Sequence, residues 1–304
     1  MSTMLGAVAL AMFPGGLFVI AMGLAYEWAD RKLVARLQNR LGPRWFQPVA
    51  DTVKLLSKEE IVPDGVDARL FLGLPVIVLA GALTAALYVP MAGPPALSFP
   101  GDLIVTVTLL GLLTIGTGLA GTNTLNRFSL QGATRTLTLL FSYEAPFLLA
   151  LLGPAVVAGS WEIGEIATRL GGRWVAISQP VGFALALVGL MGKLELPPFD
   201  APEAETEIVA GALTEYSGRG LGLFRLAKSV ELAVGLTLVA ALYLGGIGSP
   251  VAHLVKTGGL LLVMATLQSL FARLRIDQVV GAWWRYGAVL ALGQWLLLIA
   301  WARV

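Results

Sequence analysis

Acidic side chains are the residues of this chain most able to do chemistry, and several of them gather within one short stretch. They are Asp200, Glu203, Glu205, Glu207 and Glu215. Crowded carboxylates raise one another's pKa, and burial raises it further, so such a cluster can hold and release protons near neutral pH. The alternative is a set of solvated acids at a helix N-terminus, where the helix dipole favours them. That alternative fits Glu203 better than it fits Glu207 or Glu215.

The same stretch carries signals for the start of a helix. Asp200 and Glu203 fit a capping box, and Pro202 falls within the first turn. The spacing predicts a helix from Asp200 that presents Glu203 and Glu207 on one face. Like charges at this spacing repel, so helix stability alone does not explain them.

Two further carboxylates interrupt long apolar segments. Glu144 lies well inside the segment 136–159, and Glu231 lies a few residues into the segment 226–247. A carboxylate within a membrane-spanning segment is costly, and is by default a proton relay or an ion site. A structural role for Glu144, and a local ion pair between Glu231 and Lys228, are the alternatives.

The elements that must position these groups belong to a membrane protein. Of the 304 residues, 57% are hydrophobic and 13% are charged, whereas a soluble domain carries about 25% charged residues. The chain has no cysteine and one histidine, His253, which excludes disulfides, cysteine-ligated iron–sulfur clusters and ordinary zinc sites within it. Any redox chemistry must therefore take place in another polypeptide.

Apolar segments of about 20 residues, the length that crosses a hydrocarbon core of about 30 Å, predict the architecture. We expect an all-α integral membrane protein with about eight transmembrane helices, forming a single transmembrane domain over residues 1–304. The predicted spans are residues 4–25, 70–90, 103–122, 136–159, 179–196, 226–247, 254–272 and 286–302.

Basic residues predict the orientation of these spans. Most of the 21 Lys and Arg residues fall after spans one, three, five and seven. The positive-inside rule then puts both termini outside and these connections in the cytoplasm. The two longest connections, loop one (residues 26–69) and loop five (residues 197–225), follow spans one and five. The chain is expected to be a multi-pass protein of the cell membrane.

Loop one contains a predicted surface helix. Gly42-Pro43 forces a turn, and Pro48 suits the first turn of a helix. Val49, Val53 and Leu56 then form one apolar stripe. From the pattern alone, this helix fits a lipid-bound anchor as well as a binding surface.

Three motifs resemble a known family. Loop one reads Asn39-Arg40-x-Gly42-Pro43, then Gln47-Pro48-x-Ala50-Asp51-x-x-Lys54-Leu55-x-x-Lys58-Glu59. Loop five reads Pro198-Phe199-Asp200-x-Pro202-Glu203-Ala204-Glu205, then Thr214-Glu215-Tyr216-Ser217-Gly218. Between them lies Gly132-Ala133-x-Arg135, leading to Ser142-Tyr143-Glu144. Together they resemble subunit 1 of respiratory complex I over nearly the whole chain.

Three departures indicate a branch of that family. Only Arg44, Trp45 and Phe46 separate the Gly-Pro and Gln-Pro pairs, where quinone-reducing members carry a longer segment. Leu139 replaces a glutamine, and the sequence just before loop five differs from the Thr-Asn-Arg of complex I members. The compact loop resembles the membrane anchors of energy-converting [NiFe] hydrogenases and formate hydrogenlyase.

The resemblance implies an ion-translocating anchor subunit without a catalytic centre or cofactor of its own. The implied proton or ion pathway comprises Glu144, Glu203, Glu205, Glu207, Glu215 and Glu231. The implied loop surface for a redox partner or a quinone comprises Arg36, Arg40, Gln47, Asp51, Lys54, Lys58, Glu59, Asp200 and Arg219. Arg135, Tyr143 and Lys228 would couple the two.

The resemblance also implies the partners. A hydrogenase-like large subunit with the [NiFe] centre and an iron–sulfur small subunit would dock on the cytoplasmic side. Antiporter-like and small membrane subunits and lipids would surround the chain, and nucleic acid is not expected. One alternative is the quinone-binding subunit of an NADH:quinone oxidoreductase-like complex, and a more distant one is an independent secondary transporter, for which the sequence lacks an internal repeat.

Overall fold

The computed structural model describes residues 15–91 and 93–302, and within those ranges every regular element is a helix. The elements are α2 (Gly16–Leu37), α3 (Gln47–Ser57), α4 (Ala68–Tyr88), α5 (Asp102–Thr122), α6 (Arg127–Ala158), α7 (Ile163–Arg169), α8 (Val175–Ser178), α9 (Pro180–Lys193), η1 (Ala201–Glu203), α10 (Glu205–Ile208), η2 (Gly211–Leu213), α11 (Gly218–Tyr243), α12 (Pro250–Leu270), α13 (Ile276–Ala282), η3 (Trp283–Gly287) and α14 (Ala288–Ala302). The prediction of an all-helical fold is confirmed for these residues.

The predicted spans agree with the helices in position, but not all of them in length. Within the described residues, α4, α5, α6, α11 and α12 are long and apolar enough to cross a membrane. The apolar α9 has only 14 residues, and α14, after a π-helical stretch, has 15. Part of the first predicted span, residues 4–14, lies outside the described residues. The count of eight spans and the outside location of both termini stay predictions.

Several boundaries differ from the prediction for a physical reason. α2 runs to Leu37, well past the predicted end at residue 25, because Glu27 and the buried Asp30 accept hydrogen bonds from Ser229 of α11 and Gln268 of α12. α6 begins at Arg127, where Asn126 caps the first turn, rather than near residue 136. Both extensions carry polar side chains that the hydropathy of a span does not reveal.

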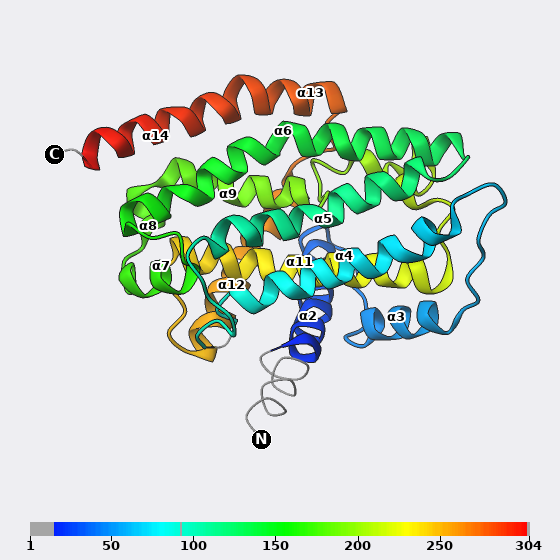
Figure 1. The fold of residues 1–304 in the computed structure, drawn as a ribbon, viewed down its shortest axis with the longest axis horizontal. Coiled ribbons are helices and arrows are strands. Elements are labelled where there is room, and N and C mark those ends of the chain that lie inside the picture. The colour runs from blue at the N-terminus through cyan, green and yellow to red at the C-terminus, as the bar shows by residue number, and fades with distance from the viewer. Residues whose placement is uncertain (1–14, 92, 303–304) are drawn as a thin grey trace.

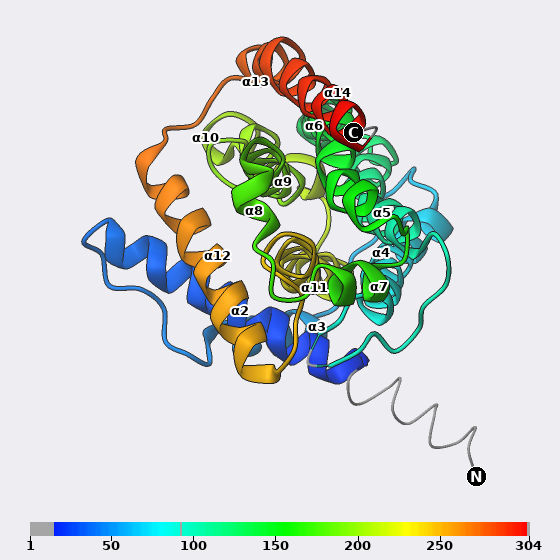
Figure 2. The same ribbon diagram turned by 90° about the vertical axis from the view of Figure 1, so that its left-hand side faces the viewer.

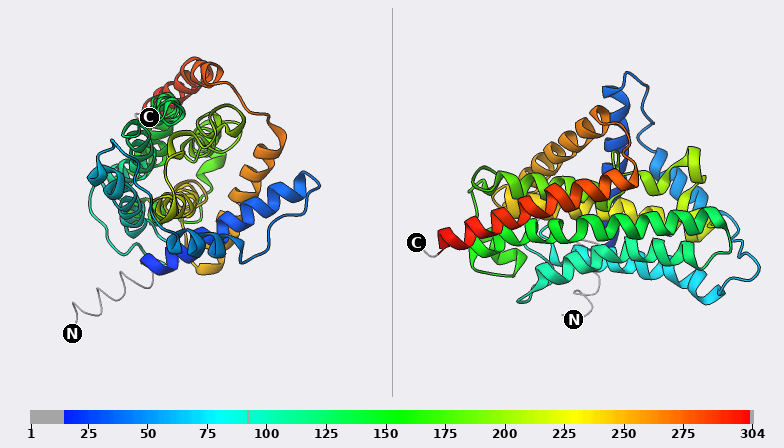
Figure 3. Two further views of the ribbon diagram at one scale, coloured as in Figure 1. Left: turned by 90° about the vertical axis from the view of Figure 1, so that its right-hand side faces the viewer. Right: turned by 90° about the horizontal axis from the view of Figure 1, so that it is seen from above.

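The helix α11 forms the centre of the bundle. Of its most apolar 18-residue window, 94% is buried inside the protein, more than in any other candidate span of the described residues. Figure 2 shows α9, α12, α2, α4 and α5 arranged around it. The helices α4, α5, α6 and α11 run side by side along the long axis, whereas α2 and α12 are inclined to them (Figures 1 and 3). Glu231 on α11 therefore lies inside the protein rather than toward lipid.

The surface helix predicted in loop one is confirmed as α3, which begins at Gln47 with Pro48 in its first turn. Its stripe of Val49, Val53 and Leu56 is exposed, as a helix lying on another surface requires. On the same helix, Asp51 accepts a hydrogen bond from Gln47 and lies 3.9 Å from Arg31.

The single helix predicted from Asp200 is wrong. Loop five instead forms three short turns, η1, α10 and η2, and Asp200 makes no capping hydrogen bond. The helix is interrupted because the acids of this segment have separate partners: Glu203 pairs with Lys228, and Glu207 pairs with Arg135. The two carboxylates therefore do not share one helix face.

Gly211 allows loop five to fold against the bundle. Its φ is +59°, and an added Cβ would lie 2.2 Å from the backbone oxygen of Pro202. Gly132 of α6 approaches the same turn so closely that its own Cβ would lie 2.2 Å from the Ala212 nitrogen. Neither position can accept a side chain without displacing backbone.

We expect Gly211→Ala to destabilise the protein by about 2–4 kcal/mol, because the left-handed conformation and the backbone overlap both oppose a Cβ. The purified protein should unfold at a lower temperature, as measured by its tryptophan fluorescence. Gly259→Ala is the matched control, since Gly259 lies in α12 with nothing within 4 Å of an added Cβ. Equal melting temperatures for the two variants would contradict this account of loop five.

Candidate functional site

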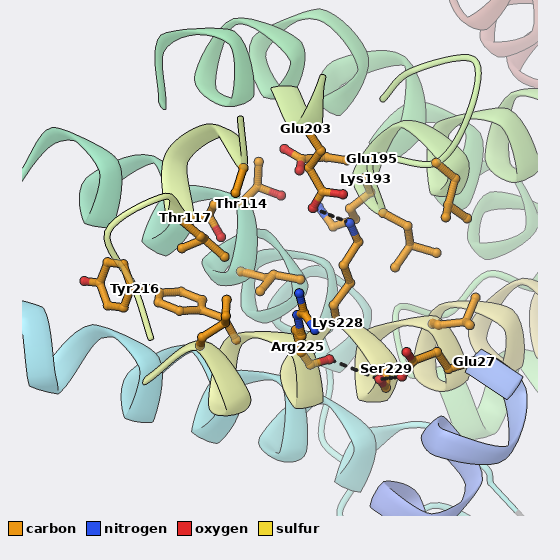
Figure 4. A pocket seen from close by; sticks show the side chains of 18 of the residues that line it. Glu27, Thr114, Thr117, Lys193, Glu195, Glu203, Tyr216, Arg225, Lys228 and Ser229 are labelled. Atoms are coloured by element: carbon orange, nitrogen blue, oxygen red, sulfur yellow. Dashed lines mark hydrogen bonds and ion pairs between the residues drawn. The ribbon is translucent and has the colours of Figure 1, made fainter. Parts of the chain in front are cut away.

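A cavity of about 510 Å³ with both apolar and charged walls lies between α2, α5, α9, α11 and loop five (Figure 4). Its walls are apolar at Leu113, Leu213 and Phe224. Its charged and hydroxyl-bearing lining residues are Glu27, Asp30, Arg31, Thr114, Thr117, Lys193, Glu195, Glu203, Thr214, Tyr216, Arg225, Lys228 and Ser229. So many ionisable groups around one cavity in an apolar bundle mark it as the candidate functional site.

A second cavity of about 360 Å³ adjoins the first at loop five. Glu195, Leu196, Glu203 and Lys228 line both cavities. The ammonium of Lys228 lies 2.7 Å from the Glu203 carboxylate, so this ion pair stands at the boundary between the two cavities.

Lys228 is the shared counter-ion of the site. It rises from the central helix α11, and its charge acts on Glu203, Glu195 and Glu231. Figure 4 shows its side chain reaching from α11 toward Glu203 and Glu195. The sequence-based alternative of a Lys228–Glu231 ion pair is not what forms, since the hydrogen-bonded partner of Lys228 is Glu203. The predicted residues Glu203 and Lys228 are thus brought together.

Glu195 is a member of the site that sequence reasoning missed. The residue lies just past the end of α9, with only 9% of its surface exposed. Burial, together with the negative charge of Glu203, raises the pKa of Glu195 from 4.5 to about 7, although Lys228 opposes the shift. In the sequence it stands at the end of an apolar run, within the last turn of a predicted span. Its positive φ of 49° shows that the helix has already ended.

Glu144, whose side chain is partly exposed, and the buried Lys193 form an ion pair in the bundle. The Lys193 ammonium lies 2.9 Å and 3.3 Å from the two carboxylate oxygens of Glu144, and the lysine side chain is fully buried. The rings of Tyr143 and Phe147 each lie 5.6 Å from the same ammonium. Glu144 was predicted, but its partner Lys193 was not. Lys193 also lines the larger cavity, so it links the cavity to Glu144.

Glu231 is fully buried on α11, and neither of its carboxylate oxygens has a hydrogen-bond partner among the described residues. The charged groups that act on it are Lys193, Glu144, Lys228 and Glu195. The two carboxylates predicted within spans, Glu144 and Glu231, therefore share one electrostatic environment.

The other predicted acids lie apart from the cavities or at their edge. Asp200 lines the second cavity, 2.5 Å from Arg273. Glu207 is half exposed on its pair with Arg135, which also donates to the Ala201 carbonyl. Glu215 accepts a hydrogen bond from Asn126. The side chain of Glu205 lies outside the described part of the chain.

Most predicted residues of loop one form an exposed surface rather than lining the cavity. Exposed members are Arg36, Arg40, Lys54, Lys58 and Glu59, as is Arg219 from loop five. Asp51 connects this surface to the cavity, because its neighbour Arg31 also pairs with Glu27, which accepts a 2.5 Å hydrogen bond from Ser229 of α11. Tyr143 is buried, with its hydroxyl 3.4 Å from that of Thr114.

Asp30 is a second buried acid that the sequence did not single out. It lies in the extension of α2 with 8% of its surface exposed, and Gln268 donates to it over 2.9 Å. Burial raises its pKa from 3.8 to about 6, against the lowering effects of Gln268 and Arg31. The loop-facing end of the cavity thus holds acids with raised pKa values from two different elements.

The site resembles no metal centre. Within residues 15–91 and 93–302 no three histidine, aspartate or glutamate residues come together as a metal site would require. The arrangement instead suits the movement of a charge, because acids and ammonium groups alternate from the loops to the interior of the bundle.

Comparisons with known proteins agree over nearly the whole chain. A family model described as NADH dehydrogenase matches residues 9–299. A protein of Thermomicrobium roseum is 35% identical over 306 residues, covering 90% of each chain, and one of Carboxydothermus hydrogenoformans is 33% identical over 286 residues, covering 89% of this chain and 81% of that one. Both relatives are named as subunits of an NADH-quinone oxidoreductase.

A solved structure has the same fold. It is a chain of the membrane-bound sulfane sulfur reductase, an archaeal respiratory membrane complex. The TM-score is 0.86 at 23% identity, with 98% of this chain and 100% of the other covered. The likeness extends over the whole bundle.

We expect one carboxylic acid of the purified protein to titrate near pH 7, being neutral below that pH and ionised above it, because burial holds Glu195 in its neutral form. Infrared spectra taken across this pH range should show the carboxylic acid band decline, and Glu195→Gln should remove that component. Glu203→Gln should move the titration to lower pH, because it removes the neighbouring negative charge. A titration near pH 7 that persists in Glu195→Gln would contradict the assignment.

Proposed function

The chain belongs to the NADH dehydrogenase family, and from this premise we propose that it is the membrane-anchor and ion-translocating subunit of a complex I-like respiratory complex. Electron transfer in peripheral subunits would be coupled through this chain to the movement of protons or sodium ions. The chain itself would supply charged side chains and a docking surface, and its partners would supply the redox centres.

One observation carries the proposal: charged side chains follow one another from loop five into the bundle. Asp200 pairs with Arg273 at the outer edge of the second cavity. Glu203 pairs with Lys228 at the boundary of both cavities, beside the buried Glu195. Further in, the series continues to Glu231, which has no hydrogen-bond partner among the described residues, and to the pair of Lys193 with Glu144. Other acids of loop five, Glu205, Glu207 and Glu215, would extend the series toward the partner subunits.

The loops provide the link to electron transfer. Loop one presents a basic surface and loop five presents acids, so both suit binding of a charged peripheral subunit. A change of charge at that junction would first meet the ion pairs of Asp200 and Glu203, which are the ones nearest to the cavities. Because each ion pair lies beside the next charged group, a shift at one alters the protonation of its neighbour.

For the redox partner we favour a membrane-bound [NiFe] hydrogenase, with its large subunit and iron–sulfur small subunit on the cytoplasmic side and antiporter-like subunits in the membrane. The compact segment Arg44–Phe46 of loop one supports this choice. A short loop leaves less chain to enclose a quinone headgroup beneath a peripheral subunit.

A quinone-reducing complex is the second candidate. The cavity of about 510 Å³ has apolar walls at Leu113 and Phe224 and polar groups at Thr114 and Tyr216, which is the mixed lining that an amphiphilic ring ligand requires. The names of the relatives from Thermomicrobium roseum and Carboxydothermus hydrogenoformans also point to a quinone as the acceptor in those proteins.

We expect Glu144→Gln to lower the ratio of ions translocated to electrons transferred by about tenfold or more, because the neutral amide can neither bind nor release a proton. The ratio is measured on the intact complex reconstituted into liposomes, with an added electron donor and acceptor. Asp277→Asn is the control, since Asp277 is exposed on α13 and lines neither cavity. A normal ratio in an assembled Glu144→Gln complex would contradict ion translocation by this chain.

Gentle extraction from the native membrane should separate the two candidates. Co-purification of subunits that contain nickel and turn over hydrogen would support the hydrogenase. Partners without nickel that reduce a quinone would support the second candidate. A chain that purifies without any redox partner would contradict both, and would favour an independent transporter.

A further inference from the structure

Lys193 places an ammonium group beside Glu144 and within electrostatic reach of the buried Glu231. Its side chain has no exposed surface, and its ammonium lies 2.9 Å from Glu144 on α6. Burying a lysine costs free energy unless its charge is paired, and among the described residues the ion-pair partner of Lys193 is Glu144.

The packing of α9 against α11 brings Glu231 near Lys193. Figure 1 shows α9 leading from α8 toward loop five and α11 leading back toward α12, so the two helices run in opposite directions. They touch where Gly235 meets Leu190, since a Cβ added to Gly235 would lie 2.4 Å from that leucine. One turn further along each helix, on the same faces, stand Lys193 and Glu231.

The electrostatics agree with this placement. Of all charged groups, Lys193 acts most strongly on Glu231, ahead of Glu144, Lys228 and Glu195. Both oxygens of Glu231 nevertheless have no hydrogen-bond partner among the described residues. An isolated, fully buried carboxyl group is most stable as the neutral acid. The three side chains are then the Lys193 ammonium, the ionised Glu144 carboxylate and the neutral carboxylic acid of Glu231.

Lysine is suited to change partner in such a setting. Its ammonium is a compact charge on a flexible four-carbon stem, whereas arginine would grip a carboxylate with two parallel hydrogen bonds. The rings of Tyr143 and Phe147 lie 5.6 Å from the ammonium and offer it an attractive surface without fixing a direction. Gly111 leaves open space beside the pair, because a Cβ there would lie 3.7 Å from Glu144 and 3.9 Å from Lys193.

We propose that Lys193 is the moving charge of the intramembrane path, its ammonium alternating between Glu144 and Glu231. In one arrangement Lys193 pairs with an ionised Glu144 while Glu231 holds a proton. In the other, Glu231 has released its proton and pairs with Lys193, while Glu144 has gained one. One proton enters at one carboxylate as another leaves at the second, and the three groups together stay neutral throughout. This inference rests on the proposed function and adds the residue that carries the exchange.

Lys193→Arg tests the proposal, because arginine keeps the positive charge and the ion pair with Glu144 but does not release its partner easily. In the intact reconstituted complex we expect normal assembly and melting temperature, with the ratio of ions to electrons lowered about tenfold. A lysine that served only as a fixed counter-ion would be replaced by arginine without loss. A wild-type ratio in Lys193→Arg would therefore overturn the proposal.

Glu231→Gln is the second variant, and it tests the exchange even if arginine does not fit the buried site of Lys193. It is isosteric and breaks no hydrogen bond of Glu231 among the described residues, so the complex should assemble, yet it removes the second station of the lysine. A lowered ratio supports the exchange, and a wild-type ratio overturns it.

Glu144→Gln in the same assay distinguishes failure of the lysine exchange from failure of the proposed function. If Glu144→Gln loses translocation while Lys193→Arg or Glu231→Gln keeps it, only the lysine exchange fails. If Glu144→Gln keeps it, the proposed function fails.

Discussion

The burial of charge inside an apolar bundle is the constraint on which the rest of this structure depends. A charge in a low-dielectric interior is stable only when it is paired, and removing one partner of a buried pair costs about 3–5 kcal/mol. The bundle satisfies this constraint by placing its most buried helix, α11, at the centre and surrounding it with helices that supply counter-charges. Lys228 and Glu231 on α11 are met by Glu203 from loop five and by Lys193 from α9.

The same constraint explains the irregular shape of loop five. A regular helix from Asp200 would have turned Glu203 and Glu207 to one side, where like charges repel. The chain forms short turns instead, so that each acid reaches a basic residue on a different helix. Gly211 makes these turns sterically accessible, and the resulting loop lines both cavities on the side where partner subunits are proposed to bind.

Much of this architecture could be predicted from the sequence. Hydropathy located the apolar helices, the turn residues and apolar stripe located α3, and the motifs of the two loops indicated the family to which the chain belongs. The carboxylates within the spans, Glu144 and Glu231, were identified because an acid is conspicuous among apolar neighbours. Their environment could not be predicted, since it depends on which helices pack together. Lys193 and Glu195 could not be identified as site residues from the sequence, because both stand at the end of an apolar run. A basic residue is expected there on the cytoplasmic side, and an acid at the end of a span is not unusual. Only the close packing of α9 against α6 and α11 brings Lys193 to Glu144, and only the folding of loop five over the bundle buries Glu195.

The central claim is that electron transfer in the partner subunits changes the protonation of carboxylates inside this chain. Infrared difference spectra of the intact complex, recorded between its oxidised and reduced states, test that claim most directly. We predict carboxylic acid bands in the difference spectrum that disappear one by one in Glu195→Gln, Glu231→Gln and Glu144→Gln. A difference spectrum with no carboxylic acid band, or with bands that none of these substitutions alters, would contradict the claim.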